Sequence, residues 1–401
     1  MSNKNFTIIY LFNLLFIVQT IYSQSTNNLS SSPYSLYGLG LSNELNTGKT
    51  NSLGNTGFAM PSTHAINGLN PASFGAIPKG SFLYDIGLKL QQEKLFADGN
   101  EEFQFNGNFS NIAIAFPLSE KSGFGFSLIP FTNVGYTVLG LENSIDGSSD
   151  TFLANINGSG GLNEIQLNYG YSINNKFRLG IKGSYLFGNI KEEETDFIGS
   201  SILNISKVNT YSGFRLSTGL QYDITKNISF GGIINLPSKL NGNQVRTIVA
   251  NADEPVEETN DLEIFKLPLE VGFGLHTKLS DKLFFNIDYK RSFWGTTNQT
   301  DLIGNFVNQD FIGIGTEFIP IKNSPNYWKR INYRAGFNID NGNLAIKDNR
   351  ISNYNINFGL GLPISIRRNS LLNFNYSYGK KGQVSNGLIE ENFHTVTLNF
   401  S

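Results

Sequence analysis

The sequence has no cysteine and only three histidines in 401 residues. The absence of thiols excludes a disulfide framework, a thiolate metal site and a cysteine nucleophile. Charged residues make up only 15% of the chain, compared with about 25% in a typical soluble protein. The 30 Lys and Arg nearly balance the 32 Asp and Glu, and no basic block is present. Electrostatic binding of nucleic acid is therefore excluded.

The chain also lacks a long apolar run beyond its start, whereas a membrane-spanning helix needs about 20 such residues. The one candidate, residues 6–22, follows a lysine and is interrupted by Asn13 and Gln19. A positive start, an apolar middle and a small residue at Ser23 predict a secretory signal peptide over residues 1–23. A transmembrane anchor is the alternative, and the two amides and the short length count against it. The mature chain is expected in a bacterial periplasm, an outer membrane or outside the cell.

Glycine and aromatic residues are abundant, with 42 Gly, 33 Phe and 17 Tyr. From residue 81 onward, apolar and polar side chains alternate with the period of a β-strand, as around Ile165, Leu167 and Tyr169. The runs are roughly ten residues long, which is typical of transmembrane β-barrels. A soluble β-sandwich also alternates, but its strands usually have about 5–6 residues. The lengths favour a barrel whose apolar face meets lipid and whose polar face lines the lumen.

Short and long connections alternate along the chain, as in barrels with short periplasmic turns and longer extracellular loops. Six turns and seven loops predict an all-β fold, a fourteen-stranded antiparallel transmembrane β-barrel over residues 81–401 in the bacterial outer membrane. The run from Val396 to Phe400 is expected to pair with the first strand and close the barrel. The long polar stretches, including 132–161, 189–211 and 237–262, are expected as extracellular loops. The expected strands are 81–91, 109–117, 122–131, 162–173, 177–188, 212–224, 228–236, 263–279, 283–293, 309–319, 330–339, 351–362, 371–379 and 392–400.

Residues 24–80 do not alternate and are rich in Ser, Asn, Gly and Pro. They are nevertheless expected to be ordered, because exposed disordered chain has no use for scattered large apolar residues. Irregular backbone is tolerated at membrane depth where it does not face lipid, which predicts a hatch or plug inside the lumen. A disordered linker is the alternative. The residues expected to form the hatch or a ligand site are Phe58, Asn70, Pro71, Ala72 and Phe74.

The Asn70-Pro71-Ala72-Ser73 turn, together with a signal peptide and a fourteen-stranded barrel, resembles the long-chain fatty acid transporter (FadL-like) family. The opening stretch over residues 32–40 is more similar to the Bacteroidetes branch of such barrels. The resemblance implies passive, hatch-gated diffusion of hydrophobic small molecules, either fatty-acid-like or aromatic, across the outer membrane, with a lateral exit through the wall. The same branch includes barrels that serve as a partner, shuttle or plug in the type 9 protein secretion system. Position 73 is Ser where the family commonly has Gly, which weakens the transporter assignment.

Two function hypotheses follow, a transporter of hydrophobic molecules and a non-transporting barrel subunit of a type 9 secretion machine. A passive polar porin is a third. The expected partners are outer-membrane lipid, a hydrophobic small-molecule ligand and a large secretion-system protein. The three histidines fall on separate segments, so we expect no catalytic residues, and we expect no cofactor. We expect no metal site, because the acidic runs at 192–196 and 253–258 are interpreted as solvated loops.

Overall fold

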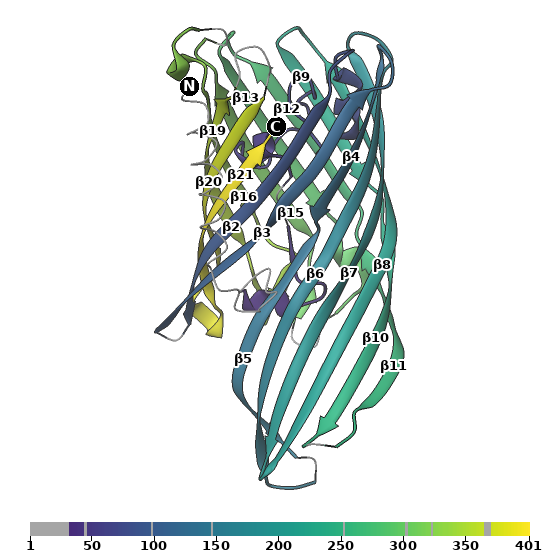
Figure 1. Cartoon of the computed structure of the whole chain (residues 1–401), viewed down its shortest axis with the longest axis vertical. Coiled ribbons are helices and arrows are strands. Elements are labelled where there is room, and N and C mark those ends of the chain that lie inside the picture. The colour runs from purple at the N-terminus through teal and green to yellow at the C-terminus, as the bar shows by residue number, and fades with distance from the viewer. Residues whose placement is uncertain are drawn as a thin grey trace, which may run out of the picture.

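The computed structural model describes residues 32–401 except 44–45, 98, 146, 252, 301–303, 322–323 and 365–369. The expected signal peptide therefore lies outside the described residues. Fourteen strands form a closed antiparallel barrel (Figure 1). In order around the wall these are β2 (Leu83–Ala97), β3 (Asn100–Pro117), β4 (Ser122–Pro130), β6 (Thr151–Ser172), β7 (Phe177–Ile198), β8 (Ser201–Asp223), β9 (Ile228–Asn235), β12 (Glu270–Lys278), β13 (Leu283–Ser292), β15 (Gln309–Phe318), β16 (Asn332–Asp340), β19 (Asn353–Pro363), β20 (Leu371–Gly382) and β21 (Glu390–Phe400).

The last strand closes the barrel, because β21 pairs with β2 from Phe400 opposite Ile86 to Glu390 opposite Phe96. Its other edge pairs with β20. The predicted strand number and the predicted closure are both confirmed. Closure satisfies the backbone N–H and C=O groups that an open edge would leave unpaired in lipid.

The wall alternates as the sequence predicts, with apolar side chains outward and polar side chains inward. Ile181 and Phe214 are exposed on the outer face, whereas Gln166 and Asn168 are buried on the inner face. The short turns lie at one end of the barrel, which identifies that end as periplasmic. An apolar outer band on a closed antiparallel barrel places the protein in the bacterial outer membrane. No helix in the described part of the chain is long and apolar enough to span a membrane.

The extracellular side differs from the prediction, because four expected loops are largely strand. The first, residues 92–108, is made of extensions of β2 and β3. Residues 132–161, 189–211 and 237–262 contribute long extensions of β6, β7 and β8 and the strands β5 (Thr132–Ser144), β10 (Ser238–Ala250) and β11 (Val256–Leu267). Their apolar residues are scattered over both faces because they lie beyond the lipid, so the regular alternation that reveals a membrane strand is interrupted. We call this sheet, residues 132–144, 151–161, 188–198, 201–212, 238–250 and 256–267, the extracellular wall. It projects from one side of the barrel (Figure 1).

Where the extracellular wall meets the barrel, three pairs of consecutive strands are separated by short breaks. β4 and β5 both pair with β6 and are separated at Phe131. β9 and β10 are separated at Pro237, and β11 and β12 at Pro268, where a missing N–H interrupts the ladder. Arg215 spans the two proline breaks, since it donates to the carbonyl oxygens of Leu236 at 3.1 Å and Pro268 at 2.7 Å. The expected single strand 263–279 is thus two strands.

The described residues of 32–80, which we call the luminal segment, run inside the barrel (Figure 1). Their short elements are η2 (Pro33–Leu36), β1 (Leu41–Ser42), α2 (Gly48–Asn51) and η3 (Pro71–Ala76). Apolar side chains of this segment are buried, among them Leu53 and Ile66. The remaining elements belong to connections: a small sheet of β14 (Gly304–Phe306), β17 (Leu344–Ile346) and β18 (Asn349–Arg350), and the turns η4 (Trp294–Thr297), η5 (Tyr327–Lys329) and η6 (Ser385–Gly387).

Candidate functional site

Inward-facing glycines of the wall provide the space in which the luminal segment lies. A Cβ atom added to Gly125 would overlap the ring of Phe74, and one added to Gly272 would crowd the ring of Phe58. A Cβ atom at Gly180 would overlap the backbone of Pro71. The luminal segment therefore fits against the wall in one position only. A side chain at any of these glycines would displace the backbone or the rings that lie opposite.

Asn70 connects the turn at the start of η3 to the wall. Its side-chain oxygen accepts a hydrogen bond from the N–H of Ala72 at 3.0 Å, which caps the helix. Its amide nitrogen donates to the carbonyl oxygens of Phe58 at 2.6 Å and of Leu220 in β8 at 3.0 Å. The amide fits because the wall residue beside it is Gly219. One side chain thus links two turns of the luminal segment to the barrel.

Buried side chains of the wall bind the backbone of the luminal segment directly. One carboxylate oxygen of Asp288 in β13 accepts the N–H groups of Gly57 at 2.6 Å and Phe58 at 2.9 Å. Gln221 in β8 donates to the carbonyl oxygens of Phe58 at 3.1 Å and Met60 at 3.0 Å. These bonds satisfy backbone groups that irregular structure leaves without helical or sheet partners.

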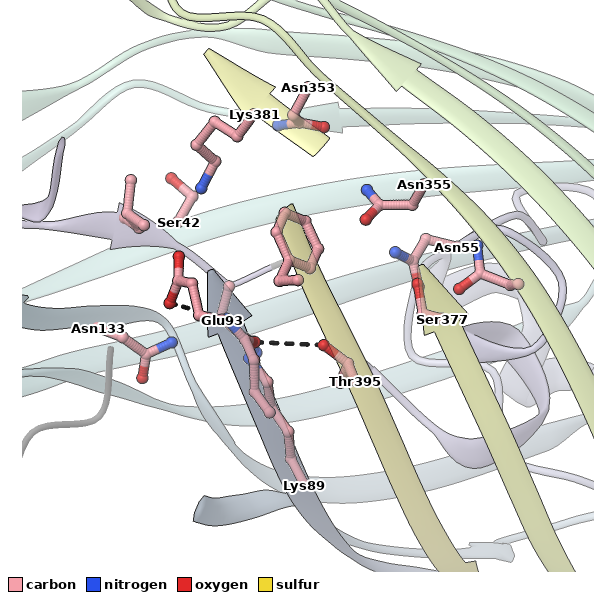
Figure 2. Close-up of a pocket in the computed structure, with 15 residues that line it drawn as sticks. Ser42, Asn55, Lys89, Glu93, Asn133, Asn353, Asn355, Ser377, Lys381 and Thr395 are labelled. Atoms are coloured by element: carbon pink, nitrogen blue, oxygen red, sulfur yellow. Dashed lines mark hydrogen bonds between the residues drawn. The ribbon is translucent and has the colours of Figure 1, made fainter. Parts of the chain in front are cut away.

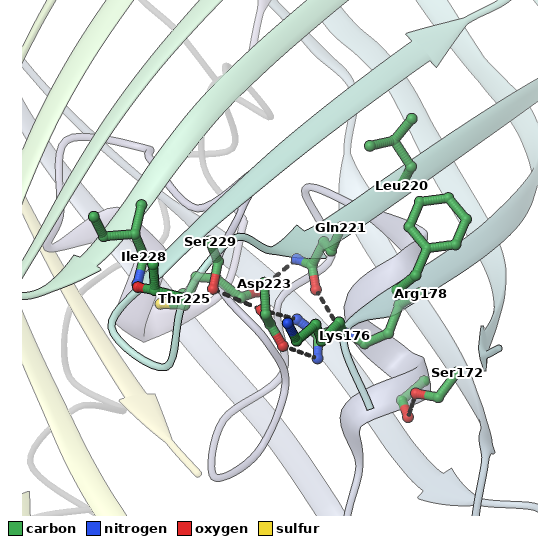
Figure 3. A network of polar contacts seen from close by, with 12 residues as sticks. Ser172, Lys176, Arg178, Leu220, Gln221, Asp223, Thr225, Ile228 and Ser229 are labelled. Carbon is green, nitrogen blue, oxygen red and sulfur yellow. Dashed lines mark hydrogen bonds and ion pairs between the residues drawn. The ribbon is translucent and has the colours of Figure 1, made fainter. Parts of the chain in front are cut away.

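The Gln221 contact belongs to a larger polar network on the periplasmic side of the lumen (Figure 3). Arg178 donates to both carboxylate oxygens of Asp223, at 3.0 and 2.8 Å, and to the side-chain oxygen of Gln221 at 3.2 Å. Ser229 donates to Asp223 at 2.7 Å. Strands β7, β8 and β9 are thereby coupled to the same part of the luminal segment.

An ion-pair chain fixes α2 of the luminal segment. The Lys49 ammonium lies 2.7 Å from Glu317 in β15, and Glu317 also accepts from Arg334 in β16 at 2.8 Å. Glu317 and Arg334 are almost fully buried. Breaking a buried pair by removing one partner is costly, because it leaves the other charge without compensation.

The barrel wall has a lateral gap on its extracellular half. β3 pairs with β4 only over residues 112–117, and its residues 100–111 pair with β2 alone among the described strands. After the break at Phe131, β5 turns away with β6, and Figure 1 shows β3 and β5 diverging. On the inner side of the gap, β1 pairs with the first residues of β5, Leu41 opposite Asn133 and Ser42 opposite Thr132.

A cavity of about 100 Å³ lies behind this gap, and we call it the gap-side cavity (Figure 2). Its lining is mostly amide, hydroxyl and charged, with Lys89, Glu93 and Lys381 among the residues that Figure 2 labels. Leu41 and Phe393 are its large apolar contributors. The space next to the gap therefore contains ionised and amide groups beside apolar side chains.

A second luminal cavity of about 190 Å³, the charged cavity, has both acidic and basic side chains. Lys182, Lys290 and Glu164 line it, and Arg215 lies there with its ion-pair partner Glu270 at 3.3 Å. Apolar rings, including that of Trp294, cover part of the lining. Such a cavity suits water or a small polar solute better than a hydrocarbon, because an apolar guest would remove the hydration of several ions.

A third cavity of about 510 Å³ opens at the periplasmic end, next to the turn between β12 and β13. His64 of the luminal segment and His276 of β12 line it together with Lys49 and Glu317. The sequence places the two histidines on separate elements, and the barrel brings them to one mouth. His276 is also hydrogen-bonded to Asn286 at 2.7 Å. The described residues contain no group of three or more His, Cys, Asp or Glu suited to a metal ion.

The residues expected from the sequence to form the hatch or ligand site are all buried in the luminal segment. Phe58 and Asn70 are in contact and Phe58 lines the charged cavity, whereas Pro71, Ala72 and Phe74 belong to η3, which packs against the inner wall. Sequence reasoning missed the charged side chains of the cavities and the lateral gap. The alternation signals inward positions such as Lys182, but their convergence on one cavity depends on the register of the barrel.

The closed fourteen-stranded barrel matches the fold of FadL-type outer-membrane transporters. Residues of the Pseudomonas putida toluene transporter TodX superpose with a TM-score of 0.64 at 14% identity, covering 90% of this chain and 98% of that one. The Ralstonia pickettii toluene transporter TbuX gives 0.62 at 14% identity, with 89% and 98% covered. A Pseudomonas aeruginosa FadL homologue gives 0.62 at 11%, with 90% and 98% covered. Two of these neighbours are toluene transporters and the third is a FadL homologue, and at this identity they show the shared fold.

Sequence comparison identifies the family. No curated protein matches the chain. The model of the BamG family matches residues 3–401, which is nearly the whole sequence, and the chain therefore belongs to the BamG family.

Proposed function

We propose that the protein is an outer-membrane barrel with a fixed luminal plug that serves as a membrane-embedded subunit of a protein assembly. The observation that carries this proposal is the chemistry of the central lumen, where the gap-side cavity and the charged cavity both place ionised and amide side chains among their apolar ones. The type 9 secretion machine expected from the sequence is one assembly of this kind.

The lumen chemistry disfavours passage of a hydrophobic molecule through the centre of the barrel. A guest that buries about 200 Å² of apolar surface gains roughly 5 kcal/mol at ~25 cal/mol per Å². In the charged cavity it would displace water from Lys182, Lys290 and Glu164. Desolvating ions costs roughly several kcal/mol each, so the loss exceeds the gain.

The anchoring of the luminal segment favours a plug over a gate. Anchors come from separate parts of the wall, with Asp288 and Gln221 on one stretch of the segment and Glu317 on another. Moving the segment would break these contacts together. Each buried polar group left unsatisfied costs about 1–3 kcal/mol, and the buried ion pair costs more.

A second candidate is hatch-gated diffusion of hydrophobic small molecules, which the sequence resemblance implies. The lateral gap between β3 and β5 favours it, since a gap in the wall offers a route into the lipid. The shared fold favours it as well, because TodX and TbuX are toluene transporters. In this candidate the luminal segment, with Phe58, Asn70, Pro71, Ala72 and Phe74, is the hatch.

Native mass spectrometry of the protein, gently extracted from the outer membrane of its host, separates the two candidates. A stable complex with another protein is expected. A monomer that retains a few hundred daltons of lipid-like mass, about the mass of one fatty acid, would instead support transport.

Uptake measurements provide the second arm. Cells lacking the protein are complemented with the wild type or with Asn133→Trp, which fills the inner side of the gap. Uptake of labelled toluene and of a labelled fatty acid is expected to be equal in all three strains. Uptake that depends on the protein and is blocked by Asn133→Trp would overturn the plug proposal. Thr247→Trp, on the extracellular wall away from the gap, is the matched control.

A further inference from the structure

The extracellular wall ends in a strand whose outer edge is open. β10 pairs with one edge of β11, from Ser238 opposite Leu267 to Ile248 opposite Val256. On the other edge no described strand pairs with residues 256–264, because the barrel continues instead from β12 to β13. Figure 1 shows β11 as the outermost strand of the wall.

The open edge ends at Lys266, where a side chain imitates a neighbouring strand. The side-chain oxygen of Gln299 accepts the N–H of Lys266 at 2.6 Å, and its amide nitrogen donates to the carbonyl oxygen of Lys266 at 2.9 Å. The backbone of Lys266 is thus already satisfied in the way that a paired strand would satisfy it. Residues 256–264 beyond it are exposed on both faces, with only Leu262 partly covered.

The edge carries a concentration of negative charge that is unusual for this chain. Six carboxylates lie along it and the turn before it, whereas the nearby cations are Lys266, Lys239 opposite it on β10, and Arg246, which lies 3.7 Å from Glu258. The acids are Asp253, Glu254, Glu257, Glu258, Asp261 and Glu263. Charges on an edge strand prevent pairing between identical copies, since like charges are brought together. The same charges favour a strand of opposite sign.

We propose that β11 is a docking edge for a basic, extended segment of a partner protein, which adds to the extracellular wall as a further antiparallel or parallel strand. Main-chain hydrogen bonds along an open edge provide affinity in such strand addition. The carboxylates provide selection, because they attract lysine and arginine side chains of the added strand and repel acidic ones. Val256 and Ile264, both exposed, offer apolar contacts at the two ends of the edge. The inference rests on the proposed function, in that the added strand comes from a subunit of the assembly.

Peptide binding tests this edge directly in the full-length protein in detergent. The probe is a labelled ten-residue peptide of alternating Lys and Val, followed by fluorescence anisotropy. Its two controls are the Glu-Val counterpart and a Lys-Val peptide with alternate backbone nitrogens methylated, which keeps the charge and removes strand hydrogen bonding. We expect the basic peptide to bind at least tenfold more tightly than either control, and more weakly as salt rises.

Charge reversal in the protein provides the matched variants. Glu257→Lys with Asp261→Lys is expected to reverse the preference, so that the Glu-Val peptide binds better. Asn157→Lys, on β6 within the sheet and not adjacent to β11, adds a cation without altering the edge and is expected to leave the preference unchanged. Equal binding of the methylated peptide would overturn strand addition, and so would a failure of the basic peptide to bind.

The charge-reversal variant also separates this inference from the proposed function. If native mass spectrometry retains the complex while peptide binding fails, the docking edge is wrong and the assembly subunit stands. If the basic peptide binds but the host membrane contains no complex, the edge stands as a strand-binding surface and the assembly proposal is wrong. Loss of both the complex and peptide binding in the variant supports the two together.

Discussion

Phe74 provides the sharpest test of how firmly the luminal segment is held. Its ring is fully buried among Ile66, Ile77 and two alanines of β3, and it lies against Gly125 of β4. Truncation of a buried phenylalanine to alanine costs about 3–5 kcal/mol. Because roughly 1.4 kcal/mol is a factor of ten, Phe74→Ala is expected to raise the opening constant of the segment about a hundredfold to a few thousandfold.

Hydrogen exchange of the detergent-solubilised barrel measures that constant. Amide protection over residues 46–77 is expected to fall by the same factor in Phe74→Ala, while protection in strands β7 and β13 is retained. Phe214→Ala is the matched control, since Phe214 is an outward-facing ring of the wall and its loss leaves the lumen unchanged. Unchanged exchange over residues 46–77 would show that the segment does not depend on this ring for its position.

Gly125→Ala provides a second test of the contact between Phe74 and the wall. The new Cβ would overlap the Phe74 ring, so the single variant is expected to lose about 1–3 kcal/mol through overpacking. In Phe74→Ala with Gly125→Ala the methyl group occupies vacated space, and the combined loss is expected to be smaller than the sum. Strictly additive losses would refute the argument that the two residues fit each other.

Three further predictions concern polar contacts. Asp288→Ala leaves two buried N–H groups of the luminal segment without an acceptor and is expected to cost about 2–6 kcal/mol, measured as exchange over the segment. Glu317→Ala leaves Arg334 buried without its carboxylate, with an expected loss of about 3–5 kcal/mol in thermal unfolding, and Arg334→Met in the same chain is expected to restore part of it. Burial raises the pKa of Glu192, but hydrogen bonds from Lys207 and a tyrosine outweigh it and hold that pKa below the ordinary 4.5. The carboxylate therefore stabilises the extracellular wall fully above pH 4.5 and stops doing so as the pH falls through its folded-state pKa, so exchange in β7 and β8 is expected to rise there, and Glu192→Gln is expected to remove this pH dependence.

The membrane part of the fold could be predicted from the sequence, because lipid imposes a strict alternation of apolar and polar side chains on each strand. Every expected strand is present in the structure, with 263–279 divided into two at Pro268, and the periplasmic ends agree within a few residues. The strands of the extracellular wall could not be predicted in this way, since strands in water need no continuous apolar face. The run Glu192-Glu193-Glu194 illustrates this, because it was expected as a solvated loop and lies within β7. There Glu192 and Glu194 share one face with Lys207, and Glu193 pairs with Lys191 on the other.

The candidate site could be predicted from the sequence only in part, because its contacts depend on how the strands are aligned in the barrel. The large apolar residues of the luminal segment signal burial, but their partners are wall glycines that become specific only once the barrel register is set. The meeting of Asn70 with Gly219, or of Phe74 with Gly125, joins residues far apart in the chain. Nothing in the local sequence of either residue of a pair identifies the other.

The barrel fold alone does not determine the function of this protein, because function depends on the side chains that line the lumen. The barrel shares its architecture with toluene transporters, yet shared architecture does not specify what a lumen admits. The inward residues decide that, and here Lys182, Lys290 and Glu164 surround the central space while Lys89 and Glu93 stand behind the gap. A hydrocarbon entering from the membrane would meet ions at both places. A protein segment carries its own hydrogen-bonding groups and charges, so the ionised groups of the interior and the open acidic edge of β11 both suit a polypeptide better than a hydrocarbon.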